Sequence, residues 1–171
     1  AGGCGGAGLA AGVRQGVERA GCDEYLGYIR ITRGTAPRGH EFPERRPDPT
    51  VVMTVKQLQR PDPTLHETGV SVITTPDLRW KRCDIKSIAL LPNILAKQLA
   101  HEAGAYEALL VDDRERVTEG SSTSPFRVAG GGVLTPPPGS PLLPPVHSLV
   151  PLDPVPTLGH RLPDAFSTVH L

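Results

Sequence analysis

The residues best suited to chemistry in this 171-residue sequence lie in one short basic segment. Residues 79–86 read RWKRCDIK and end on Lys86, after a predicted strand and ahead of a predicted helix. A lysine amine becomes nucleophilic when neighbouring positive charge or loss of hydration lowers its pKa, and Schiff-base formation with an aldehyde requires such an amine. A lysine in a basic run is more often a solvated surface residue, so the candidate catalytic role of Lys86 needs support from other segments.

A second polar segment offers donors for a carboxylate. Residues 32–43 read TRGTAPRGHEFP and place Arg38 two residues before His40. The planar guanidinium of an arginine matches a carboxylate with two parallel hydrogen bonds, and a nearby histidine can add another donor. The Arg-x-His pair could therefore bind a carboxylate, but without further support a loop arginine and histidine are more often only exposed polar residues.

Three segments in chain order resemble the class IV pyridoxal-phosphate-dependent aminotransferases, and within that class the D-amino-acid (D-alanine) aminotransferases. They are TRGTAPRGHEFP at residues 32–43, RWKRCDIKS with the LLPN and LAKQ that follow it, and VTEGSSTS at residues 117–124. The resemblance runs from about residue 25 to residue 143. It implies the fold of that class, with pyridoxal 5'-phosphate as the cofactor.

The resemblance also implies roles for four residues around the cofactor. Lys86 would form the Schiff base with pyridoxal 5'-phosphate and then move the substrate α-proton. Glu119 would keep the pyridine nitrogen protonated, so that the ring can accept the electrons released when that proton leaves. Ser122 would add hydroxyl hydrogen bonding near the cofactor, and Leu143 would lie against the ring face.

For the substrate, the resemblance implies that Arg38 and His40 bind the α-carboxylate across the interface of a homodimer. The Arg-x-His pair favours D-amino acids, so the expected reaction exchanges an amino group between D-alanine or another D-amino acid and a 2-oxo acid. Two alternatives of the same class are a branched-chain aminotransferase and a 4-amino-4-deoxychorismate lyase. A third alternative, from another class, is a non-catalytic fragment. The chain as given is expected to be inactive or only weakly active.

The elements that must position these residues are mostly strands. Alternating apolar and polar residues predict four strands and two shorter ones, and helical spacing predicts one helix, with Pro92 in its first turn and Gly104 as its C-terminal cap. The predicted strands are residues 25–33, 51–57, 69–75 and 105–111, with the short ones near 126–128 and 132–135; the helix is 88–103, and 112–116 is a turn. The expected fold class is α+β. By resemblance it is a β-rich pseudo-barrel cofactor domain of fold type IV with a covering helix, plus a remnant of an N-terminal α/β domain.

Composition divides the chain into four parts. Residues 1–24 are rich in glycine and alanine and are expected to be disordered or the remnant of a helix. Residues 25–60 are the expected remnant of the N-terminal domain, and residues 61–143 are a partial cofactor domain. Residues 144–171 are a proline-rich tail expected to be disordered, because proline denies donors to helices and sheets. The family continues after Leu143 with a phosphate-binding Gly-Val/Ile-Thr-Arg helix, which PPVHS replaces here, so a truncated member with a divergent C-terminus is expected.

Overall charge and cysteine content argue against several kinds of partner and site. Eighteen basic and eighteen acidic residues give a formal net charge of zero, which argues against nucleic acid or an anionic membrane as a partner. The three cysteines, Cys4, Cys22 and Cys83, have no close pairing, which argues against a disulfide framework and a zinc site. A soluble, cytoplasmic protein without a metal is the expectation.

Overall fold

The structure is a computed structural model that describes residues 6–129, 132–134 and 142–143 of the chain. Two compact units divide the chain, residues 1–62 and residues 63–171, and each is described by itself. The first five residues and the predicted proline-rich tail, 144–171, lie outside the described residues.

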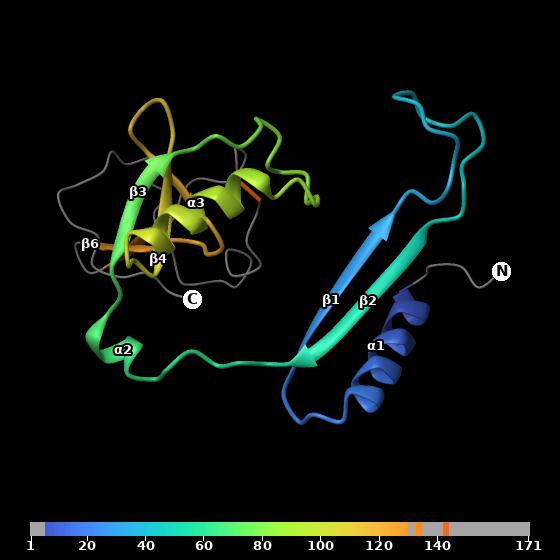
Figure 1. Cartoon of the computed structure of the whole chain (residues 1–171), viewed down its shortest axis with the longest axis horizontal. Helices are drawn as coiled ribbons and strands as arrows, with labels where there is room; N and C mark the ends of the chain where they lie inside the picture. Colours follow the sequence, from blue (N-terminus) through green and yellow to red (C-terminus); the bar gives the residue numbers. More distant parts are fainter. Residues whose placement is uncertain (1–5, 130–131, 135–141, 144–171) are drawn as a thin grey trace. The chain divides into compact units, whose positions relative to one another are not determined.

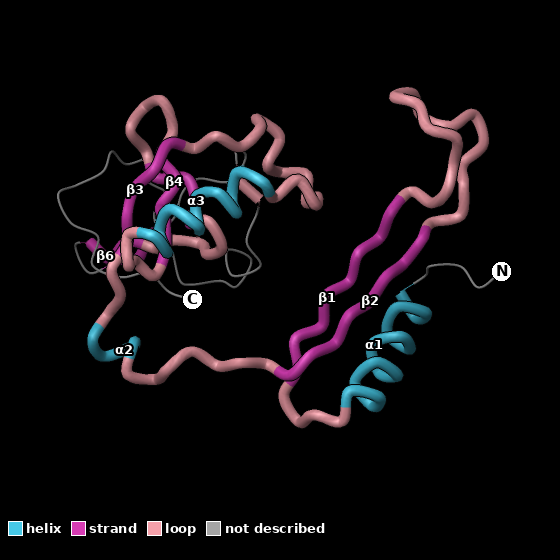
Figure 2. Tube along the Cα trace, viewed as in Figure 1, coloured by secondary structure: helices cyan, strands magenta, loops and turns pink. Residues whose placement is uncertain are grey.

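The first unit is built on an antiparallel pair of strands (Figure 1). β1 (Tyr25–Thr32) pairs with β2 (Thr50–Gln57) along its whole length, with Tyr25 opposite Gln57 and Thr32 opposite Thr50. Both strands were predicted from the alternation of apolar and polar residues, and both are confirmed. The loop between them, residues 33–49, has no helix or strand (Figure 2).

The glycine- and alanine-rich start forms a helix from residue 6 onward, so disorder is the wrong alternative for that stretch. α1 (Gly6–Ala20) lies along β2 (Figure 1). Gly16 permits this approach, because a Cβ atom added there would lie 2.8 Å from Cγ2 of Val55. A Cβ atom added at Gly12 would make only an ordinary contact, 3.5 Å from Cε of Met53. The helix thus gains packing against the sheet that compensates for the poor helix propensity of glycine.

The second unit contains a three-stranded sheet with a helix on it. β3 (Val72–Pro76) runs parallel to β4 (Glu107–Val111), and β5 (Val117–Gly120) pairs antiparallel with β4, which is therefore central. α2 (Leu65–Thr68) precedes this sheet, and β6 (Arg127–Ala129) and β7 (Gly132–Leu134) form a separate antiparallel pair. The strands predicted at these positions are confirmed, whereas α2 and β5 were not foreseen.

α3 (Leu91–Glu102) connects β3 to β4 and packs on the sheet through small residues. Ala96 and Ala100 of the helix meet Ala108 and Leu110 of the central strand, with Ile73 and Ala105 packed at the edge of this core. Small side chains at the contact let the helix axis come close to the sheet.

The ends of α3 are set by proline and glycine. The helix begins at Leu91 rather than at residue 88, and Pro92 stands in its first turn, where a missing backbone N–H costs no hydrogen bond. Gly104 follows the helix with a φ of 68°, the left-handed conformation expected of a cap glycine. The predicted helix is thus confirmed with a shorter N-terminus.

A tight turn joins β4 to β5 and brings β5 back alongside β4. Oδ1 of Asp112 accepts the backbone N–H groups of Arg114 and Arg116, each at 2.9 Å, and Asp112 returns its own N–H to the carbonyl of Arg116 at 2.9 Å. The turn predicted at 112–116 is therefore a hairpin turn. Because the hairpin reverses the chain, the VTEG that follows must pair with β4 as a third strand.

The α+β class expected from the sequence is confirmed, with the helix covering the sheet as predicted. Among the described residues, no helix combines the length and the apolar character that crossing a membrane would need.

Candidate active site

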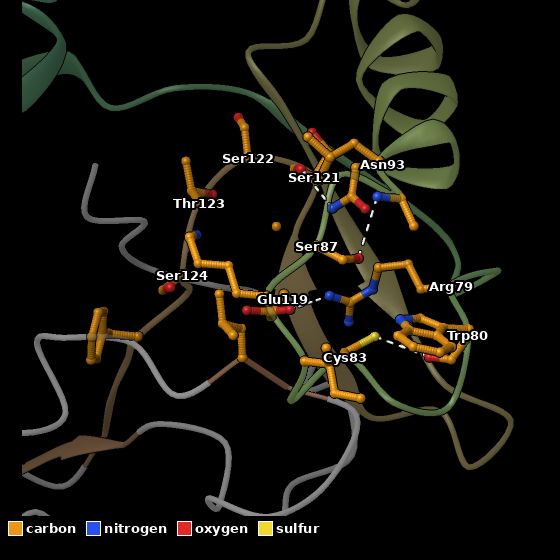
Figure 3. A pocket seen from close by; sticks show the side chains of 17 residues that line it. Arg79, Trp80, Cys83, Ser87, Asn93, Glu119, Ser121, Ser122, Thr123 and Ser124 are labelled. Carbon is orange, nitrogen blue, oxygen red and sulfur yellow. Dashed lines mark hydrogen bonds and ion pairs between the residues drawn. The ribbon is translucent and has the colours of Figure 1, made fainter. Parts of the chain in front are cut away.

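A cavity of about 490 Å³ opens at the end of the three-stranded sheet in the second unit (Figure 3). Its walls come from the loop between β3 and α3, the first turn of α3, β5 and the turn after β5. Four of the predicted site residues, Lys86, Glu119, Ser122 and Leu143, line this cavity. The fold thus brings together side chains that lie in three separate segments of the sequence.

Arg79 anchors one wall of the cavity. Its Nε and Nη2 donate to the two oxygens of Asp77 at 2.9 and 2.8 Å, and its Nη1 donates to Oε2 of Glu119 (Figure 3). Thr118 donates its hydroxyl to Asp77 at 2.7 Å and so completes the cluster. The side chains of Arg79, Asp77 and Glu119 are 8%, 7% and 16% exposed, so this ion pair is shielded from water.

The electrostatics of the cluster differ between its two carboxylates. Burial acts to raise the pKa of Asp77, but hydrogen bonds from Arg79 and Thr118 outweigh it and leave that pKa below its ordinary value. Burial also raises the pKa of Glu119, and here the hydrogen bond and charge of Arg79 offset the effect only in part. Two opposing influences therefore act on Glu119: burial favours its protonated form, and Arg79 favours its ionised form.

A second carboxylate, Glu107, holds the turn that follows β5. Glu107 begins the central strand and is fully buried. Its Oε1 accepts the hydroxyl of Ser121 and the backbone N–H of Ala108, and its Oε2 accepts the hydroxyls of Ser122 at 2.7 Å and Thr123 at 3.1 Å. Burial acts to raise the pKa of Glu107, but these hydrogen bonds and the charge of Lys97 outweigh it and lower the pKa.

Two further contacts fix the same turn. Nδ2 of Asn93, in the first turn of α3, donates to the carbonyl of Ser121 at 2.9 Å (Figure 3). Gly120 leaves no room for a side chain, because a Cβ atom there would lie 2.2 Å from Oγ1 of Thr123. The turn is thus fixed by α3 as well as by the sheet.

Lys86 lies exposed in the loop between β3 and α3 and lines the cavity. The sequence favoured a lysine surrounded by free cations, but two of its basic neighbours are neutralised. Arg79 pairs with Asp77 and Glu119, and Arg82 makes two hydrogen bonds of 2.9 Å with Asp84. The charges of Arg79 and Arg82 are therefore balanced by carboxylates, and these arginines do not repel the ammonium group of Lys86 as the sequence suggested. Lys86 is instead one of the exposed residues that line the cavity.

Arg38 and His40 belong to the first unit. Both are exposed in the loop between β1 and β2. At the base of the same loop, Arg33 lies with its guanidinium carbon 3.9 Å from the centre of the Phe42 ring, a cation–π contact that helps to order this segment. Gly34 allows the loop to start, with a φ of 110°.

Arg79, Asp77 and Glu107 were missed as site residues from the sequence. Arg79 stood in the basic segment that drew attention to Lys86, and Asp77 comes directly after a predicted strand. The signal for Glu107 was weaker, since it is a charged residue at the start of an apolar strand, EALLV. A charge in such a position must find several partners to be buried.

Comparison with known families gives a match along most of the chain. The sequence profile of the amino-transferase class IV family matches residues 4–148. The D-alanine aminotransferase of Staphylococcus aureus is 44% identical over 110 residues, which are 64% of this chain and 38% of that protein. That of Bacillus licheniformis is 44% identical over 99 residues, which are 58% of this chain and 34% of that protein. The chain therefore spans less than two fifths of the length of these relatives.

Solved structures share the fold. The branched-chain amino acid aminotransferase of Escherichia coli superposes with a TM-score of 0.67 at 19% identity, over 83% of this chain and 48% of that one. A fold IV transaminase of Curtobacterium pusillum gives a TM-score of 0.62 at 24% identity, over 82% of this chain and 47% of that one. At these identities the likeness is one of fold.

Proposed function

The chain belongs to the class IV aminotransferase family, and we propose that it carries the cofactor site of a pyridoxal-phosphate-dependent D-amino-acid aminotransferase. The reaction would exchange an amino group between D-alanine or another D-amino acid and a 2-oxo acid. One observation carries the proposal: Lys86, Glu119, Ser122 and Leu143 line one cavity.

The donor set of this cavity fits a pyridoxal group. It combines an amine able to condense with an aldehyde, a carboxylate able to accept a ring N–H, and an apolar side chain able to cover a ring face. Its volume of about 490 Å³ lies within the usual range for a cofactor pocket. When bound, the cofactor supplies an electron sink for the pair left behind when the substrate α-proton departs.

Each of the chain's own residues then has a definite task. Lys86 would hold the cofactor through Nζ, and its amine is the group in the cavity that could receive the substrate α-proton. Glu119 would accept the ring N–H of the cofactor and so favour the protonated form of that nitrogen. Arg79 donates to Oε2 of Glu119 and favours its ionised form, which offsets in part the rise that burial causes in the pKa of Glu119.

The preference for D-amino acids rests on two lines of support. The curated relatives at 44% identity are D-alanine aminotransferases, and the Arg38-x-His40 pair supplies the carboxylate donors. A branched-chain aminotransferase and a 4-amino-4-deoxychorismate lyase remain the alternatives within the class. A homodimer in the cytoplasm, with Arg38 and His40 serving the partner's site, completes the proposal.

Titration of the 171-residue chain with pyridoxal 5'-phosphate, followed by borohydride reduction and peptide mass analysis, tests the proposal. We expect the reduced adduct on Lys86 and its loss in Lys86→Ala. Lys81→Ala is the matched control, because Lys81 is exposed in the same loop but is not among the residues that line the cavity. An adduct that persists in Lys86→Ala would refute the assignment of this lysine. Turnover of L-valine or of aminodeoxychorismate in place of D-alanine would favour the corresponding alternative.

A further inference from the structure

Glu107 is a buried charge to which the proposed chemistry gives no task. It is fully buried, at the start of the central strand. A buried carboxylate is costly unless hydrogen bonds satisfy its lone pairs. The carboxylate of Glu107 is satisfied mainly by one short stretch of chain, the Ser121–Thr123 turn.

The three hydroxyls of this turn share one orientation. Ser121 donates to Oε1 of Glu107, and Ser122 and Thr123 donate to Oε2. A hydroxyl has a single proton, so each of these three has committed its proton to the carboxylate. What each hydroxyl retains for the cavity is its lone pairs.

The backbone N–H groups of Gly120, Ser121 and Ser122 are committed in the same way. The N–H of Ser122 points to Oε2 of Glu107 at 3.3 Å, that of Ser121 donates to the carbonyl of Ala108 at 2.9 Å, and that of Gly120 donates to the carbonyl of Thr123 at 2.8 Å. These donors therefore face the protein and not the cavity. All four residues from Gly120 to Thr123 line the cavity.

We propose that Glu107 is a positioning residue that makes the Ser121–Thr123 turn an acceptor surface in the cofactor cavity. Resting on the proposed function, this surface receives a hydrogen-bond donor of the bound cofactor or substrate. It disfavours a phosphate, whose oxygens are mostly acceptors and whose negative charge the Glu107 carboxylate repels. The negative charge of Glu107 adds to this selection, although Lys97, its one cationic partner in the described residues, lies 3.6 Å away and offsets part of that charge. The phosphate of the cofactor must therefore bind at another wall.

The isosteric variant Glu107→Gln reverses the selection. A glutamine has one acceptor oxygen and an NH₂ group that donates, so at least one hydroxyl proton of the turn is released towards the cavity. Glu102→Gln is the matched control: it removes the same charge from the same unit, but Glu102 is exposed at the end of α3 and accepts from Gln98.

The first readouts need no cofactor. In the wild-type chain, the ¹³C shift of the Glu107 carboxyl should report an ionised group at neutral pH, and inorganic phosphate should leave the amide resonances of residues 121–123 unmoved. Phosphate should move them in Glu107→Gln and not in Glu102→Gln. A protonated Glu107, a response of the wild-type turn to phosphate, or equal responses of all three chains would overturn the proposal.

The second readout is cofactor affinity, measured by quenching of Trp80, the sole tryptophan, which lines the cavity. Glu107→Gln should weaken the Kd for pyridoxal 5'-phosphate by about tenfold, the effect expected for a charged hydrogen-bond partner. In a chain that already carries Ser122→Ala, the substitution Glu107→Gln should weaken the Kd for pyridoxal 5'-phosphate much less. The proposal is refuted if the effects of Glu107→Gln and Ser122→Ala on the Kd simply add. It is also refuted if Glu107→Gln lowers the melting temperature and leaves the Kd unchanged, because Glu107 would then have only a structural role. Failure of the wild-type chain to bind the cofactor would count against the proposed function alone, since the phosphate and ¹³C readouts still decide the role of Glu107.

Discussion

Arg79 donates from Nη1 to Oε2 of Glu119, across 40 positions of sequence, and both side chains are shielded from water. Asp77 accepts hydrogen bonds from the other two nitrogens of the same guanidinium, and these bonds hold the arginine in the orientation that faces Glu119. A carboxylate that burial would tend to protonate is thereby kept beside a fixed positive charge.

Loss of Arg79 should destabilise the second unit strongly. Arg79→Met leaves Asp77 and Glu119 without their common partner, and breaking a buried ion pair in this way costs about 3 kcal/mol in the free energy of unfolding. Arg82→Met is the matched control from the same loop, because Arg82 and Asp84 are 62% and 46% exposed; it should leave the unfolding midpoint nearly unchanged. Urea unfolding followed by Trp80 fluorescence measures both. Equal midpoints for the two variants would contradict the assigned role of the cluster.

Asp77 should make stability depend on pH in the acid range. Its pKa in the folded state lies below the ordinary value of 3.8, so its contribution is fully present above that value and is lost as the pH falls through the folded pKa. Asp77→Asn should therefore be less stable than the wild-type chain at neutral pH, and the difference should shrink as the pH falls below 3.8. Urea unfolding at a series of pH values tests this. A difference that grows on acidification would mean that the pKa shift has the opposite sign.

Glu119 should govern proton removal rather than attachment of the cofactor. Glu119→Ala should keep the borohydride-reducible adduct on Lys86 but slow exchange of the D-alanine α-proton with solvent about 100-fold or more, roughly 3 kcal/mol of barrier. Proton NMR in deuterium oxide measures the exchange rate, and mass analysis measures the adduct. Loss of the adduct at unchanged protein stability would show that Glu119 is needed for binding.

Two glycines of α1 should respond differently to the same substitution. Gly12→Ala meets only an ordinary contact with Met53, so it should stabilise the helix by about 0.5–1 kcal/mol through the lower entropy of alanine. Gly16→Ala places a methyl 2.8 Å from Cγ2 of Val55, a branched side chain with little freedom to move, so it should destabilise the packing of α1 on β2. Amide hydrogen exchange of residues 6–20 reports both changes. Equal gains in protection would mean that α1 does not depend on a close approach at Gly16.

The sequence by itself determined every strand except β5, the helix α3 and the identity of the residues that could do chemistry. Alternation of apolar residues is a local property, so β1, β2 and β4 could be predicted within a few positions. Lys86 and Glu119 stood in segments that resemble a known family, and that resemblance carried their roles. The four residues from Val117 to Gly120 were not recognised as a strand, because their pairing with β4 depends on the reversal of the chain at Asp112.

Only the tertiary structure decided which charges meet. Arg79 could equally have been one of several free cations beside Lys86, and only the folded chain shows it buried between Asp77 and Glu119. Glu107 could not be distinguished in the sequence from a surface glutamate, although it is fully buried and accepts hydrogen bonds from three hydroxyls. The physical reason is the same in both cases: the cost of burying a charge and the bonds that offset it depend on partners far away in the chain, and their proximity exists only after the sheet has formed.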